Sequence, residues 1–272
     1  STLKLEQSRL ESVTELLPMQ RDLYNRSHNF SKKLLQTWQS AVDVWRKEES
    51  RRQATEARLV AENSHPALKS LANQNAEIAE RRIQTAADIE RSSKTIKRLR
   101  EASLEISDAF ADLKNKVDHA GATSSTGVLL LKQRDELPPD REFHERAKFV
   151  QKVMPEAHLR LMEFNQLRNQ MSDPAEMATQ LLSSFRESLG DYDQQSVLEV
   201  LTRLLNDRRD FLNKAWTDQG TYLSDLNELE IANQTLHDAV EEFREYLDQR
   251  VVRVVGGGVA ESTELLAQRF DH

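Results

Sequence analysis

The 272-residue chain contains no cysteine. This absence excludes disulfide bonds, zinc sites with Cys ligands, iron–sulfur clusters and thiol catalysis. Glycine and proline are scarce, with seven and six residues, and an all-β chain needs many of both for its turns. No run of 18 apolar residues occurs, so we expect no membrane-spanning helix in this sequence. The chain opens on Ser1 without a signal peptide, which indicates a processed or excised fragment.

The chain is instead rich in helix-forming residues that are arranged in heptads. Apolar residues recur at steps of three and four along residues 68–117 and again along residues 201–250. A narrow apolar seam kept over seven heptads is typical of coiled coils. We expect the helix to continue through Gly220 in the second seam. Polar residues weaken the first seam, and such residues often fix the register between helices; they are Asn75, Arg82, Thr85, Ser92 and Ser103.

A weaker stripe runs along residues 19–61. Trp38 and Trp45 are seven residues apart and so share one helix face. We interpret them, together with Trp216, as part of a bundle core rather than as a stacking platform for nucleic acid. The other members of this stripe are Leu23, Phe30, Leu34 and Val42.

These patterns predict an all-α protein of elongated antiparallel coiled-coil hairpins in a long helical bundle. Residues 1–119 are expected to form a first long hairpin, whose arms meet at a turn over Asn63-Ser64-His65-Pro66. Residues 120–139 are expected to form a break and then a short apolar helix. Residues 140–253 are expected to form a second long hairpin with one broken arm, which includes a turn at Gly190-Asp191-Tyr192-Asp193.

The last segment, residues 254–272, is expected to be a Gly-rich linker with a terminal helix or tail. It contains Gly256-Gly257-Gly258, which we predict cannot hold a helix. A phosphate-binding loop needs a Lys followed by Ser or Thr after its glycines, whereas Val259-Ala260-Glu261 follows here. The triplet is therefore interpreted as a flexible linker.

Charge is unevenly distributed along the chain, whose net charge is −7. Residues 81–100 hold seven basic and two acidic side chains, and residues 218–250 hold nine acidic and two basic ones. A basic stretch can bind phosphate backbones, but the negative chain as a whole would repel nucleic acid. We therefore expect the two stretches to lie alongside each other in the bundle, and we expect no nucleic-acid partner.

The sequence shows no group of residues spaced for catalysis or metal binding. No two histidines are three to five residues apart, which excludes a helical zinc site of the HExxH kind. No Asp or Glu pair stands out as a general acid and base. We therefore predict no catalytic residue, no cofactor-binding residue and no metal ligand. The histidines are His28, His65, His119, His144, His158, His237 and His272.

Two stretches carry a family resemblance. Residues 124–138 read SSTGVLLLKQRDELP, and residues 196–236 read SVLEVLTRLLNDRRDFLNKAWTDQGTYLSDLNELEIANQTL. The break of small residues, the Gly-Val-Leu-Leu-Leu helix, the Leu-Pro stop and the later Arg-Arg-Asp-Phe-Leu helix resemble the N-terminal region of large bacterial mechanosensitive channels of the MscK (KefA) type, in the MscS superfamily. The chain departs from that family after residues 251–255, where the glycine triplet stands in place of an aromatic stretch that leads to the membrane.

The resemblance implies a non-catalytic periplasmic helical domain of an inner-membrane channel that opens under osmotic stress. Such a domain would assemble with other subunits of the same channel, modulate gating or contact the cell wall. It would meet the membrane only through a portion absent from this chain. The main alternative is a coiled-coil structural scaffold, cytoskeletal (spectrin-like) or chromosome-associated. Spectrin-like proteins repeat at about 100 residues, and no such repeat is visible here; chromosome-type scaffolds need nucleotide-binding ends.

Overall fold

The computed structural model describes residues 2–120, 124–185 and 194–270, and throughout these ranges the regular structure is α-helical. This confirms the predicted all-α class. Short turns at residues 64–65, 137–139 and 170–173 connect helices within the described ranges. The helices are α1 Thr2–Asn63, α2 Pro66–Ala120, α3 Ser124–Glu136, α4 Asp140–Asn169, α5 Pro174–Phe185 and α6 Gln194–Phe270.

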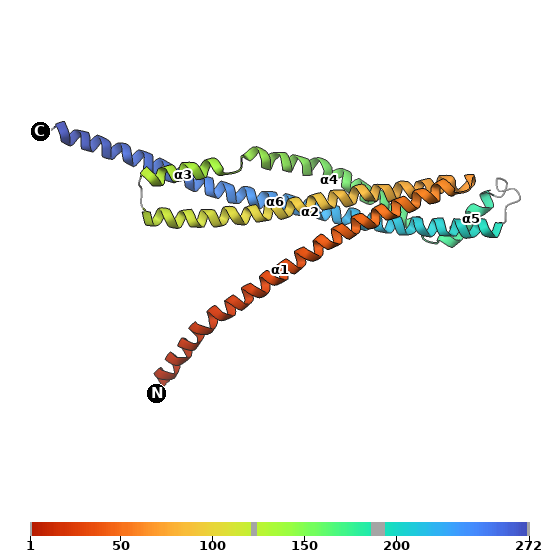
Figure 1. Ribbon diagram of the computed structural model, residues 1–272, viewed down its shortest axis with the longest axis horizontal. Coiled ribbons are helices and arrows are strands. Elements are labelled where there is room, and N and C mark those ends of the chain that lie inside the picture. The colour runs from red at the N-terminus through yellow and green to blue at the C-terminus, as the bar shows by residue number, and fades with distance from the viewer. Residues whose placement is uncertain (1, 121–123, 186–193, 271–272) are drawn as a thin grey trace.

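The molecule is a long, thin bundle (Figure 1). Its accessible surface is 18,993 Å². A compact protein of 31.3 kDa would expose about 12,000 Å² by the usual scaling of surface with mass. The excess agrees with the predicted elongated bundle, in which thin apolar seams replace a central globular core.

Helices α2 and α6 form the spine of the bundle and run parallel to each other. Asn75 Nδ2 donates to the backbone oxygen of Leu204 at 2.8 Å, and at the far end an Arg250 Nη2 lies 3.2 Å from an Asp118 carboxylate oxygen. The residue numbers of the contacting partners thus increase together along the two helices, as parallel helices require. The basic stretch 81–100 therefore lies along the beginning of the acidic stretch, as the ion pairs Arg82–Asp218 and Arg100–Glu228 show, so the two stretches are neighbours as predicted.

Helix α1 returns antiparallel to α2 at one end of the bundle. The chain turns at Ser64-His65, and Pro66 opens α2, as the sequence predicted. Four alanines make the contact between α1 and α2, and their small side chains let the two backbones approach closely. They are Ala54, Ala57, Ala76 and Ala79.

The broken arm α3–α4–α5 lies against α6. The buried residues of α4 are spaced seven apart along the side that faces α6. They are Phe143, Val150, Ala157 and Phe164. Two buried amides of α6 fix the register, because each donates to a main-chain oxygen of α4. Gln219 Nε2 lies 3.1 Å from the oxygen of Ala157, and Asn233 Nδ2 lies 3.1 Å from that of Phe143.

Helix α6 corrects one prediction and confirms another. It continues through Gly220, as expected, and also through Gly256-Gly257-Gly258, where a linker was predicted. Helix propagation adds one hydrogen bond for each residue fixed, and only nucleation is costly. A cost of about 1 kcal/mol per glycine therefore does not stop a helix that is already long. The turn predicted at residues 190–193 lies outside the described residues.

Candidate assembly surface

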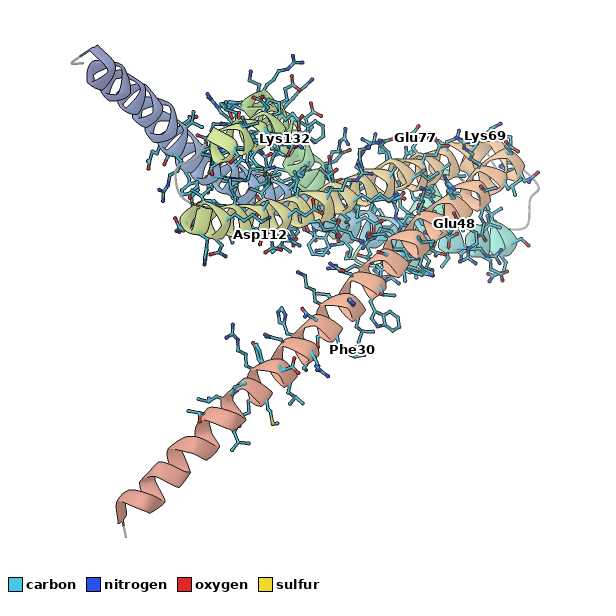
Figure 2. The ribbon with its side chains drawn as sticks, turned by 60° about the vertical axis from the view of Figure 1, so that its left-hand side comes forward. Phe30, Glu48, Lys69, Glu77, Asp112 and Lys132 are labelled. Carbon is cyan, nitrogen blue, oxygen red and sulfur yellow. The ribbon has the colours of Figure 1, made fainter. Side chains whose placement is uncertain are left out.

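Residues 16–45 of α1 leave the bundle and project from it as a single helix, here called the arm (Figure 1). Figure 2 shows Phe30 on the arm, well away from the other helices. Twelve large apolar side chains of the arm are exposed, and at 3.6 residues per turn all of them fall on one side of the helix. This outer stripe consists of Leu16, Leu17, Met19, Leu23, Tyr24, Phe30, Leu34, Leu35, Trp38, Val42, Val44 and Trp45.

The structure corrects the core prediction for the tryptophans. Trp216 of α6 is 36% exposed and stacks with the guanidinium of Arg168. Trp38 and Trp45 do share a helix face, but their side chains are 65% and 64% exposed rather than part of a core. A spacing of seven residues identifies a face and not the partner that covers it. Within the described residues, no other helix of the chain covers this face.

A second line of residues follows the opposite side of α1 and faces the bundle. Ser50, Ala54, Ala57 and Ala61 are buried along it. Trp45 and Ala54 are nine residues apart, or about 2.5 turns, so they point in opposite directions. Continued toward the N-terminus by steps of three and four, this bundle line meets only polar residues: Lys47, Asp43, Gln39, Gln36, Lys32, Asn29 and Asn25. The outer stripe is therefore a separate surface, not an extension of the contact with α2.

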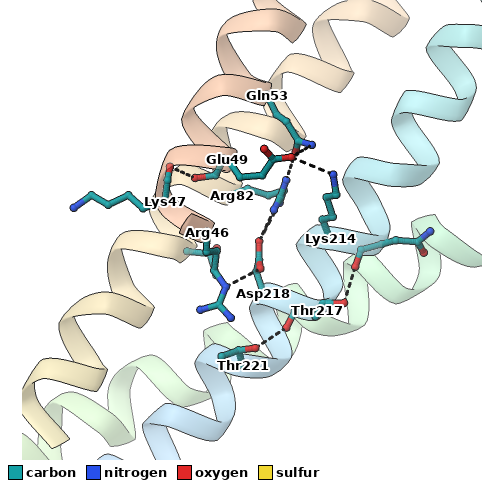
Figure 3. A network of polar contacts seen from close by, with 12 residues as sticks. Arg46, Lys47, Glu49, Gln53, Arg82, Lys214, Thr217, Asp218 and Thr221 are labelled. Carbon is teal, nitrogen blue, oxygen red and sulfur yellow. Dashed lines mark hydrogen bonds and ion pairs between the residues drawn. The ribbon is translucent and has the colours of Figure 1, made fainter. Parts of the chain in front are cut away.

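A buried polar network stands where the arm leaves the bundle (Figure 3). Asp218 on α6 receives Arg82 of α2, with Nη2 at 2.9 Å and Nε at 3.0 Å from the same carboxylate oxygen. Arg46 of α1 lies 3.3 Å from the other oxygen. The remaining Arg82 nitrogen, Nη1, donates to Gln53 of α1. One buried carboxylate thus ties three helices together at the base of the arm.

Further ion pairs surround this network. Glu49 of α1 accepts hydrogen bonds from Arg52 at 2.7 Å and from Lys214 of α6 at 3.5 Å. Glu90 of α2 lies 2.6 Å from both Lys47 and Lys94. These two ammonium groups, Lys47 first, lower the pKa of Glu90 to about 2. The carboxylate therefore stays ionised at any ordinary pH and holds Lys47 of the bundle line.

Asp225 of α6 lies in a different environment. Burial raises the pKa of its carboxyl to about 6, and the nearby carboxylates of Asp43 and Glu228 act in the same direction. A hydrogen bond from Ser93 Oγ, at 3.2 Å, only partly offsets this burial. Burial likewise raises the pKa of Asp43. Burial therefore holds the pKa values of two acidic groups at the base of the arm above their ordinary range, even though Arg46 lies 3.0 Å from Asp43.

The histidines are mostly scattered, but the structure brings two of them together. His144 on α4 and His237 on α6 have ring centroids 6.5 Å apart, although 93 residues separate them in sequence. A search for short His spacings could not find this pair. His28 lies on the arm, His65 in the first turn, His119 at the end of α2 and His158 on the surface of α4, whereas His272 lies outside the described residues.

Comparisons with known proteins identify no relative. No protein family matches the chain, no curated protein matches it, and no solved structure matches it. Along the residues that the structure describes, no helix combines the length and apolar character needed to cross a bilayer. The function must therefore be inferred from the surfaces and contacts of the chain itself.

Proposed function

We propose that this chain is a non-catalytic assembly domain in which the arm of one copy pairs with the arm of a second copy. The observation that carries the proposal is the direction of the outer stripe. It lies on the side of α1 opposite to the bundle line, so the helices packed on that line leave it uncovered within the part of the chain that the structure describes.

The outer stripe is large enough to support such pairing. Six of its residues fall within roughly one third of the helix circumference at 3.6 residues per turn, and each of them is between 45% and 73% exposed. Monomeric proteins seldom leave apolar patches above roughly 300–600 Å² uncovered. A second arm fits well because it carries the same stripe at the same spacing, which suits a two-fold symmetric contact. The six residues are Leu23, Phe30, Leu34, Trp38, Val42 and Trp45.

The setting we propose is the extramembrane, periplasmic part of a mechanosensitive channel of the MscK type. The two stretches that resemble this family form α3 and most of the first half of α6, and α3 packs against the later part of α6, at Phe243 and Leu247. Arg134 of α3 lies 3.2 Å from Asp248 of α6. A stiff bundle with a projecting arm would hold neighbouring subunits at a fixed distance and so influence gating under osmotic stress.

Sedimentation analysis of the 272-residue chain tests the assembly. We expect the wild type to self-associate, and we expect Phe30→Glu and Trp38→Glu to weaken association at least tenfold, because a buried charge replaces an aromatic anchor. Leu159→Glu on α4 is the matched control, since Leu159 is 66% exposed and lies on the bundle. A wild type that stays monomeric at high concentration, or equal effects of all three variants, would contradict the proposal.

The gene that encodes the chain tests the setting separately. Several membrane-spanning segments encoded after residue 272 would support a channel. Their absence would remove the channel from consideration and favour the coiled-coil scaffold, whereas the assembly result would stand. The two parts of the proposal can therefore fail independently.

A further inference from the structure

Two histidines and two carboxylates gather where α4 begins against α6. Asp140 and His144 are four residues apart on α4, and His237 and Glu241 are four residues apart on α6, so each pair shares a helix face. The ligand-type atoms of Asp140, His237 and Glu241 lie within 4.8 Å of one another. His144 borders this group, with its ring centroid 6.5 Å from that of His237.

We propose that Asp140, His237 and Glu241 bind a Zn²⁺ ion that fastens the start of α4 to α6, and that the imidazole of His144 at their border supplies the fourth ligand. Two imidazole nitrogens and two carboxylate oxygens form a four-coordinate ligand set of the kind that zinc accepts. Calcium and magnesium prefer oxygen ligands alone, so the histidines favour zinc over both. Two carboxylates also neutralise the double charge of the ion. This site is remote from the arm and independent of the assembly proposal.

Both imidazoles are already held in position. His144 Nδ1 lies 2.9 Å from the main-chain oxygen of Asp140. A carbonyl oxygen can only accept, so Nδ1 carries the proton and Nε2 keeps the lone pair that a metal needs. This second hydrogen bond is the usual support of a metal-binding histidine. The ring of His237 packs on the buried ring of Phe143, with centroids 4.9 Å apart.

The two carboxylates already converge on a cation, the guanidinium of Arg244. Arg244 Nη1 lies 2.6 Å from an Asp140 oxygen and also bonds to Glu241. Its Nη2 donates to the main-chain oxygen of Pro138 at 3.1 Å. Zinc must displace Arg244 from both carboxylates, and the bond to Pro138 keeps the displaced guanidinium nearby. Arg244 is therefore a competitor that sets the affinity of the site.

Calorimetric titration of the untagged 272-residue chain with zinc chloride tests the proposal. We expect one Zn²⁺ per chain, and we expect His237→Gln to weaken binding by about tenfold or more, as loss of a ligand does. The control is His158→Gln, an exposed histidine on the same α4 helix that lies outside the cluster, which should leave binding unchanged. Equal binding by the wild type and His237→Gln would overturn the site.

A second variant separates a metal site from a purely structural ion pair. Arg244→Gln removes the competing cation, so we expect zinc to bind about tenfold more tightly. Without metal, this variant should melt at a lower temperature than the wild type, and zinc should raise its melting temperature again. A variant that loses stability and does not recover with zinc, or the absence of zinc binding in both proteins, would overturn the proposal. Circular dichroism before each titration confirms that the variants remain helical.

Discussion

The buried pair Arg82–Asp218 offers the sharpest test of how the bundle is held together. The two side chains are only 4% and 7% exposed, and they join α2 to α6 beneath the base of the arm. Replacing Asp218 by Ala leaves the Arg82 guanidinium buried, with only the amide oxygen of Gln53 as its partner. Breaking a buried pair in this way costs about 3–5 kcal/mol, because the remaining charge is neither hydrated nor neutralised.

The same reasoning predicts that removing both charges is much less harmful. The double variant Arg82→Leu/Asp218→Leu removes both members of the buried pair and leaves Arg46 paired with Asp43, so we expect the free energy of unfolding to fall by less than in Asp218→Ala. The matched surface pair Arg100–Glu228, whose nitrogen and oxygen are 2.9 Å apart, is about half exposed at each side chain. Glu228→Ala should therefore cost less than about 1 kcal/mol.

Guanidinium chloride unfolding followed by helical circular dichroism measures these differences. The expected order of loss is Asp218→Ala first, then the double variant, then Glu228→Ala. A double variant that is at least as unstable as Asp218→Ala would show that the pair stabilises the bundle by net attraction. A loss below about 1 kcal/mol for Asp218→Ala would show that Arg82 is not trapped in a dry environment. Either result would refute the reasoning.

Two further changes test local features of α6. Gly220→Ala should raise the free energy of unfolding by about 0.5–1 kcal/mol, because an added Cβ meets no atom within 4 Å; a lower melting temperature in a thermal scan would contradict this. Asp225, whose pKa burial raises to about 6, should make the wild type more stable as the pH falls from 7 to 5, because its folded form binds a proton more tightly than its unfolded form. Asp225→Asn should flatten that slope and add about 1 kcal/mol at pH 7, after allowance for solvent screening; denaturant unfolding at pH 7 and pH 5 measures both effects, and an unchanged slope would refute them.

The heptad pattern predicted the long helices α2 and α6 but assigned each to a separate hairpin, whereas in the structure their seam residues bury each other. Polar seam residues proved to be specific contacts: Asn75 bonds to the main chain of α6, and Arg82 pairs with Asp218. The opposite net charges of residues 81–100 and 218–250 also predicted correctly that these stretches are neighbours. Such features repeat over many turns, so a single sequence carries enough of the signal.

Features that depend on which helices pack against each other could not be predicted from a repeating sequence pattern. The stripe through Trp38 and Trp45 has the same spacing as a core stripe, and only the spatial arrangement shows that it is exposed. The cluster around His237 was missed because each helix supplies one histidine and one carboxylate, so neither half contains the pair of histidines that a motif search requires. The glycine triplet was misjudged because local propensity was weighed without the helix that precedes it.

The bundle line explains why α1 separates from the bundle at all. In residues 54–61 this line consists of alanines, which pack closely on α2 at little desolvation cost. From Ser50 toward the N-terminus, the bundle line consists of charged and amide side chains. Burial already raises the pKa of one of them, Asp43. If the contact between α1 and α2 extended toward residue 25, it would bury a lysine, two glutamines and two asparagines without hydrogen-bond partners. Each unsatisfied group would cost about 1–3 kcal/mol. The outer stripe on the other side gains no apolar contact from such pairing, so within the described residues the arm is directed away from the bundle and its stripe stays exposed.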